Sequence, residues 1–180
     1  MPYQPSCLEA SLAEFRRYKS LGEAAIAQVT EAQLTQALDA ESNSIAVIVK
    51  HLAGNMRSRW TDFLTSDGEK PDRNRDTEFE SAPATRAEIT QLWESGWQCV
   101  FAALEPLKDA DLTRTVTIRG EAHSVAQAIV RQVAHYAHHV GQIVFLAKHF
   151  QSSNWKSLSI PRGKSAEFNL KVSGAQPSRS

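Results

Sequence analysis

The segment from Ser124 to Phe150 constrains the fold most, because its apolar residues recur at helical spacing along its whole length. At roughly 100° per residue, these residues fall on one stripe of a helix. A helix with such a stripe must bury it against other elements. The stripe consists of Val125, Ile129, Val133, Tyr136, Val140, Ile143 and Ala147.

Three further segments show the same periodicity and begin at residues that cap helices. Ser6 with Glu9, and Thr85 with Glu88, have the spacing of a capping box, and either Asn43 or Ser44 can cap the segment between them. The sequence therefore predicts helices near 6–29, 44–64 and 85–108, with a single helical turn possible from Glu31.

The connections between these helices are long. Residues 66–81 are polar, charged and interrupted by Gly68 and Pro71, which predicts a loop. Residues 113–123 alternate like two short strands, so they form either a hairpin or an extended crossover. We therefore expect an all-α fold, a four-helix bundle over residues 1–151, followed by an irregular tail over 152–180 that packs partly over the bundle.

Charge and cysteine content narrow the class of protein. Lys and Arg together number 20, as do Asp and Glu, so no net charge attracts nucleic acid or an anionic membrane. Only two cysteines occur, Cys7 and Cys99; both lie in apolar helical patterns and are expected in the core. No apolar run approaches the ~20 residues that span a bilayer. We expect a cytoplasmic protein.

Three histidines have a spacing that suits one metal ion. His135 and His139 lie four residues apart beside the apolar stripe, so their rings project from the same face of the helix. His51 borders the apolar seam formed by Ile45, Ile48, Leu52, Met56 and Phe63. Three imidazoles on facing helices can bind one divalent ion and leave a position open, although a helical pair can also merely form hydrogen bonds. Tyr136 follows His135, so the glutamate of an H-E-x-x-H motif is missing.

Three segments also resemble a known family, the DinB/YfiT-like metalloenzymes, and within it a subfamily known only as a domain of unknown function. They are KHLAGNMRSRWTDFLTSDGEKPDRNRDTEFE from Lys50, HYAHHVGQIVFLAK from His135 and SLSIPRGKSAEFN from Ser157. The family pattern is one histidine on the second helix and H-x-x-x-H on the fourth. By position, the resemblance assigns these roles to His51, His135 and His139.

The resemblance implies a four-helix bundle, usually a homodimer, that binds one divalent ion such as zinc or nickel. Some members of the family are transferases that join a low-molecular-weight thiol to an electrophile. We therefore expect a metal-dependent transferase or hydrolase that activates a thiol or water for a small-molecule ligand. The alternative is a non-catalytic, metal-stabilised dimer that acts as a stress or interaction protein.

Other polar residues are candidates for supporting roles. Asn55, Asp62 and Gln142 have the helical phase to hydrogen-bond a ligand imidazole, or they are ordinary flank residues. Arg57 and Arg59 could bind an anionic group of a substrate, or simply suit a helix C-terminus. The mixed charges of the 66–81 loop are typical of a solvated surface, but the resemblance to the subfamily is strongest there, so we expect the loop to close over the site. The arginines assigned to this closure are Arg73, Arg75 and, from the tail, Arg162.

One helix face offers a surface for a second subunit. The far side of the 124–150 helix is small and apolar, so helix 6–29, helix 85–108 or a second copy of the chain must cover it. We expect a twofold dimer through this face or a neighbouring one. The face comprises Val130, Ala134, Ala137, Gly141, Val144 and Phe145.

Overall fold

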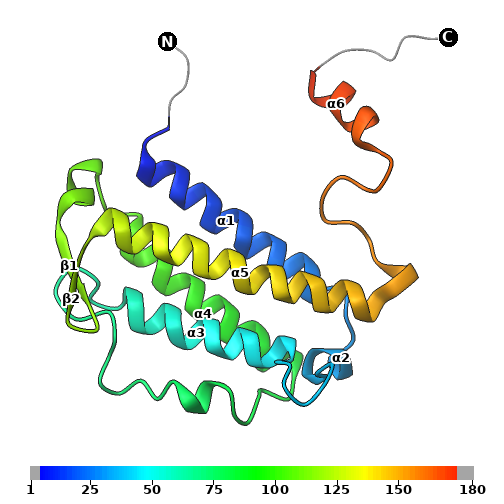
Figure 1. Ribbon diagram of the computed structural model, residues 1–180, viewed down its shortest axis with the longest axis horizontal. Helices are drawn as coiled ribbons and strands as arrows, with labels where there is room; N and C mark the ends of the chain where they lie inside the picture. The colour runs from blue at the N-terminus through cyan, green and yellow to red at the C-terminus, as the bar shows by residue number, and fades with distance from the viewer. Residues whose placement is uncertain (1–4, 174–180) are drawn as a thin grey trace.

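Four long helices form the body of the computed structural model, which describes residues 5–173 (Figure 1). Each begins directly after a Ser or Thr whose side-chain oxygen accepts a backbone N–H of the first turn, as the capping patterns predict for Ser6, Ser44 and Thr85. The chain is thus mainly helical, as expected. The helices are α1 (Cys7–Ile26), α3 (Ile45–Trp60), α4 (Arg86–Leu104) and α5 (Val125–Gln151).

Short elements connect these helices. Helix α2 (Glu31–Thr35) follows α1, and 3-10 turns η1 (Asp76–Glu78), η2 (Asp109–Thr113) and η3 (Ser152–Asn154) lie in the later connections. Helix α3 ends at Trp60, before the predicted Leu64, because Thr61 is extended and Asp62 takes a φ of 47°. Helix α4 ends at Leu104, two residues before Pro106.

The core lies among the four helices, where α4 packs on α3, α1 packs on α5, and α3 meets α5. The apolar seams predicted for α3 and α5 are buried, except that Val133 is only partly covered. An aromatic cluster of Phe15, Trp97 and Tyr136 fills the centre. The placement of both cysteines in the core was wrong for Cys7, which is exposed at the start of α1.

The connection between α4 and α5 forms a hairpin, not an extended crossover. Strand β1 (Thr115–Ile118) pairs antiparallel with β2 (Glu121–Ser124). The turn uses Arg119 and Gly120, both with positive φ, as a two-residue hairpin turn requires. The Asp67 carboxylate accepts hydrogen bonds from both turn amides, at 2.8 Å each, and so ties the 66–81 segment to the hairpin.

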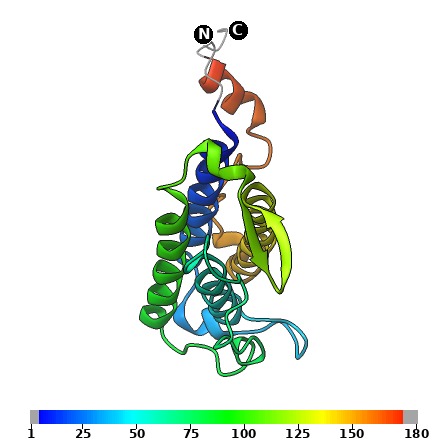
Figure 2. The same cartoon turned by 90° about the vertical axis from the view of Figure 1, so that its left-hand side faces the viewer.

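The tail is not irregular throughout, because it contains helix α6 (Ser165–Ser173). Glu167 forms ion pairs with Lys164 and Lys171, and the latter pair has the favourable order of Glu before Lys at i, i+4. Figure 2 shows that α6 stands away from the four long helices. Nearer to α5, Trp155 and Leu158 pack against the core. Within residues 5–173, no helix has the length and apolarity needed to cross a bilayer.

Candidate three-histidine site

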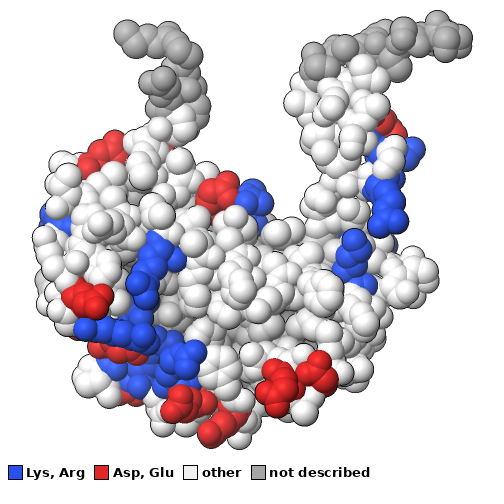
Figure 3. All heavy atoms as spheres, in the orientation of Figure 1, with Lys and Arg blue, Asp and Glu red and all other residues white. Residues whose placement is uncertain are grey.

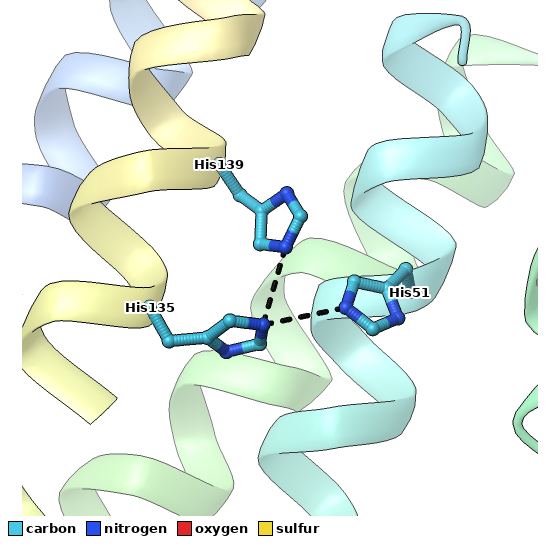
Figure 4. A group of neighbouring side chains, drawn as sticks. All are labelled: His51, His135 and His139. Carbon is cyan, nitrogen blue, oxygen red and sulfur yellow. Dashed lines mark hydrogen bonds between the residues drawn. The ribbon is translucent and has the colours of Figure 1, made fainter. Parts of the chain in front are cut away.

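Helices α3 and α5 bring His51, His135 and His139 together (Figure 4). His135 Nε2 lies 3.4 Å from His51 Nε2 and 3.1 Å from His139 Nε2. One nitrogen from each ring lies within 4.8 Å of the others, so the three residues form a group that could hold a metal ion. His51 is buried at 5% exposure, whereas His135 and His139 are half-buried on the α5 side.

Two of the three rings are fixed through their outer nitrogen. His51 Nδ1 donates to Glu78 Oε2 at 2.8 Å, and His139 Nδ1 donates to Gln142 Oε1 at 2.8 Å. His135 Nδ1 is buried and has no hydrogen-bond partner among the residues that the structure describes. Because a neutral imidazole carries a single proton, a ring that donates from Nδ1 presents a lone pair at Nε2.

The lone pairs converge on one point. In the neutral form, His51 Nε2 and His139 Nε2 are both acceptors, and both face His135 Nε2. His135 can supply at most one proton between them, so at least one pair of nitrogens is left without a donor. A cation at this point would compensate the facing lone pairs, which is the arrangement that metal ligands require.

The electrostatic surroundings keep two of these imidazoles neutral. Burial, together with the nearby His139 and His51, lowers the pKa of His135 to about 3. Burial likewise lowers the pKa of His139 to about 4, although its hydrogen bond to Gln142 acts in the opposite direction. Both rings are therefore uncharged near neutral pH and keep a lone pair for coordination.

The nitrogen separations also fit a metal ion. Two nitrogens bound tetrahedrally to zinc, at about 2.0–2.1 Å each, lie about 3.3 Å apart. The two separations that involve His135 Nε2, 3.4 and 3.1 Å, lie on either side of this value. The three imidazoles therefore form a donor set that could hold a divalent metal ion.

The 66–81 segment reaches the site through η1. The Glu78 carboxylate receives two hydrogen bonds from Arg73, and Arg73 also pairs with Glu69. Burial acts to raise the pKa of Glu78, but the hydrogen bonds from His51 and Arg73 outweigh it and leave the pKa below its usual range. The next ring, Phe79, lies 4.9 Å from the His51 ring between centroids.

Basic and acidic side chains gather over the β1–β2 hairpin and the adjoining 66–81 segment (Figure 3). Glu69 pairs there with Arg59 at 3.1 Å and with Arg119 at 3.0 Å, and Arg59 also donates to the Gly68 carbonyl. These ion pairs therefore hold the segment against α3 and the hairpin. Arg59 and Arg73, predicted as substrate-binding or closing residues, are engaged in this network.

The structure brings only some of the other predicted residues to the histidines. Gln142 contacts His139, as the helical phase suggested. Arg75 lies over Phe79, with its guanidinium carbon 5.0 Å from the ring centroid. Phe79 in turn contacts His51, so the Phe79 ring lies between Arg75 and His51. Asn55 instead accepts a hydrogen bond from the buried Tyr136 hydroxyl at 3.2 Å.

Three of the residues predicted to support the site lie away from the three histidines. Asp62 is exposed beyond the C-terminus of α3, and Arg57 is exposed beside a cavity between α3, α4 and the 72–78 segment. Arg162 is exposed in the segment that leads away from the four long helices (Figure 1). The structure therefore does not bring these three side chains to the histidines.

Sequence reasoning missed Glu78 and Phe79 as residues of the site. Nothing in the periodicity distinguishes Glu78 from the other charged residues of its segment. The only available signal was that a glutamate and an aromatic residue stand side by side in an otherwise polar loop.

Fold and site together define a mainly helical protein with a three-histidine group between two of its long helices. The chain belongs to the family described as "Protein of unknown function (DUF1572)", whose family model matches residues 4–164. The match includes all three histidines and the 66–81 segment, and it ends before α6. No curated protein and no solved structure matches the chain.

Proposed function

We propose that His51, His135 and His139 bind one divalent metal ion, zinc or nickel, and that the site activates a low-molecular-weight thiol or water for transfer or hydrolysis on a small molecule. The observation that carries this proposal is the convergence of three Nε2 atoms at separations of 3.4 and 3.1 Å. Hydrogen bonds at the outer nitrogens of two rings turn their lone pairs toward the shared point.

The number and exposure of the ligands favour a reactive site over a closed one. Closed structural zinc sites use four protein ligands, whereas catalytic sites use three and keep a position open. Within the described residues, the potential metal-binding group contains only the three histidines. His135 and His139 are half-buried, and we propose that this position faces the α5 side.

A bound divalent ion would lower the pKa of a coordinated thiol or water and so supply a nucleophile near neutral pH. The chain's own residues hold and orient that site. His51 is fixed by Glu78 and His139 by Gln142. Glu78 is itself engaged by Arg73, so its carboxylate is not free to act as a general base.

The resemblance to the DinB/YfiT-like family supports finer proposals. We propose that the four long helices are a bundle of that type, that the protein works in the cytoplasm, and that it forms a homodimer through the outer face of α5. Val130 and Phe145 on that face are 58% and 62% exposed. A Cβ added at Gly141 would meet no atom within 4 Å.

Metal analysis of the purified protein tests the proposal. We expect one bound ion per chain, lost in His135→Ala and retained in His149→Ala, which removes an exposed histidine of the same helix. Addition of the metal should raise the melting temperature of the wild type, and a suitable thiol should raise it further by linkage.

Two results would argue against the proposed activity. Equal metal content in wild type and His135→Ala would show that the histidines are not the ligands. Loss of stability on chelation without any response to thiols or substrates would favour the non-catalytic, metal-stabilised protein.

A further inference from the structure

Glu78 is a buried carboxylate in a loop whose other charged residues are exposed or half-buried. It is 6% exposed, although it comes from a segment otherwise rich in exposed charge. Its Oε2 accepts a hydrogen bond from His51 Nδ1 at 2.8 Å, whereas the other ring nitrogen of His51, Nε2, faces His135 Nε2. The carboxylate therefore contacts the site from behind one proposed ligand.

Two features fix this carboxylate. Arg73 donates from Nε to Oε1 at 2.8 Å and from Nη2 to Oε2 at 3.0 Å, a bidentate pair that sets both the position and the plane of the group. On the other side, Glu78 lies against Gly54 of α3, where an added Cβ would come within 2.3 Å of Oε1. An alanine at position 54 would therefore require the carboxylate to shift from this position.

We propose that Glu78 is a positioning residue for the metal centre: through its hydrogen bond to Nδ1 it holds the His51 ring and its tautomer so that Nε2 faces His135 and His139. This inference rests on the proposed function. Because carboxylates that hydrogen-bond a metal-bound histidine fix its orientation and raise its basicity, their loss typically weakens metal binding about 10–100-fold.

Glu78 acts through His51 and not as a fourth ligand. The imidazole ring separates its oxygen from the Nε2 atoms, and the carboxylate is absent from the potential metal-binding group of the described residues. Its Oε1 is directed to Arg73. The 66–81 segment thus contributes to the centre by holding a ligand while leaving the coordination position free.

The test is a titration of metal-free protein with Co²⁺, following both affinity and the visible d–d spectrum. Glu78→Gln keeps the shape and an acceptor but removes the charge, and Gly54→Ala drives a methyl group into the carboxylate. Glu80→Gln is the matched control in the same segment, since Glu80 is exposed.

We expect Glu78→Gln and Gly54→Ala to weaken Co²⁺ binding roughly 10–100-fold and to change the d–d bands, while the Glu80→Gln control keeps wild-type affinity. Circular dichroism of the metal-free proteins separates this effect from unfolding, because a merely structural role would lower the melting temperature without weakening binding in the folded chain. If Glu78→Gln does not fold, Glu78→Asp replaces it in the test. The shorter side chain keeps the negative charge but moves it away from His51, so we expect the same loss of Co²⁺ affinity.

Wild-type Co²⁺ affinity and spectrum in a folded Glu78 variant would overturn this inference and leave the proposed function standing. Absence of Co²⁺ binding in the wild type, or wild-type binding by His135→Ala, would overturn both. The two failures are therefore distinguishable in one series of titrations.

Discussion

A short chain of buried hydrogen bonds joins the same two helices that carry the histidines. Trp60 Nε1 on α3 donates to the Tyr136 hydroxyl on α5 at 2.9 Å, and that hydroxyl donates to Asn55 Oδ1 on α3 at 3.2 Å. Tyr136 is fully buried, and Trp60 and Asn55 are 3% and 6% exposed. Replacing Tyr136 by Phe removes one oxygen and leaves a donor and an acceptor without partners.

The cost of Tyr136→Phe follows from those two orphaned groups. A buried donor or acceptor left unsatisfied costs about 1–3 kcal/mol. The variant should therefore lose about 2–6 kcal/mol of unfolding free energy, a large share of the 5–15 kcal/mol typical of a domain. For a chain of this size, about 2–4 °C is lost per kcal/mol, so the melting temperature should fall by roughly 4–24 °C.

Urea unfolding followed by circular dichroism measures this loss, with Tyr18→Phe as the control. Tyr18 is only half-buried, and its substitution should change stability by less than about 0.5 kcal/mol. The m-value should stay constant, since the same surface is exposed on unfolding. Equal stability of the two variants would refute the reasoning, because it would mean that the buried chain contributes no more than a surface hydroxyl.

Two further predictions concern the hairpin anchor and the outer face of α5. Backbone hydrogen bonds from Glu69 and Gly120 lower the pKa of Asp67, so Asp67→Asn should reduce stability near pH 7. The difference in stability between the wild type and Asp67→Asn should disappear as the pH falls through that lowered pKa, which urea midpoints at several pH values would check. Phe145→Glu should convert the proposed dimer to a monomer in light scattering, and an unchanged mass would contradict the dimer face.

The helices could be predicted because local rules determine them. Capping residues such as Ser6 and Thr85 define the starts, and the apolar stripe of α5 is buried nearly as predicted. Helix ends were less predictable. Helix α3 stops at Trp60 because the backbone at Asp62 turns into the left-handed region, for which the apolar periodicity gives no signal. Helix α6 was missed because its stabilising ion pairs lie in a segment rich in turn residues.

The histidines could be predicted, but their surroundings could not. Helical spacing alone places His135 and His139 on one face, and the seam of α3 places His51 at its edge. The partner of His51 comes from 27 residues along the chain, across a loop whose path no periodicity determines. The surroundings of Arg59 were equally unpredictable from sequence. We predicted that Arg59 could bind an anionic group of a substrate, but it is only 5% exposed and forms an ion pair with Glu69.

The two hydrogen bonds behind the histidines should not contribute equally to metal binding. Gln142 is neutral and exposed, so when its bond to His139 Nδ1 is removed, water can take its place. Glu78 is charged and buried, so no water readily replaces its bond to His51.

If the metal centre is as proposed, Gln142→Leu should therefore weaken Co²⁺ binding less than about 10-fold, below the 10–100-fold expected for Glu78→Gln. The same titration measures both. If Gln142→Leu weakened Co²⁺ binding more than Glu78→Gln, the exposed hydrogen bond to His139 would control the metal affinity. The buried carboxylate behind His51 would then contribute less. That outcome would place the main determinant of metal binding on the exposed flank of the site.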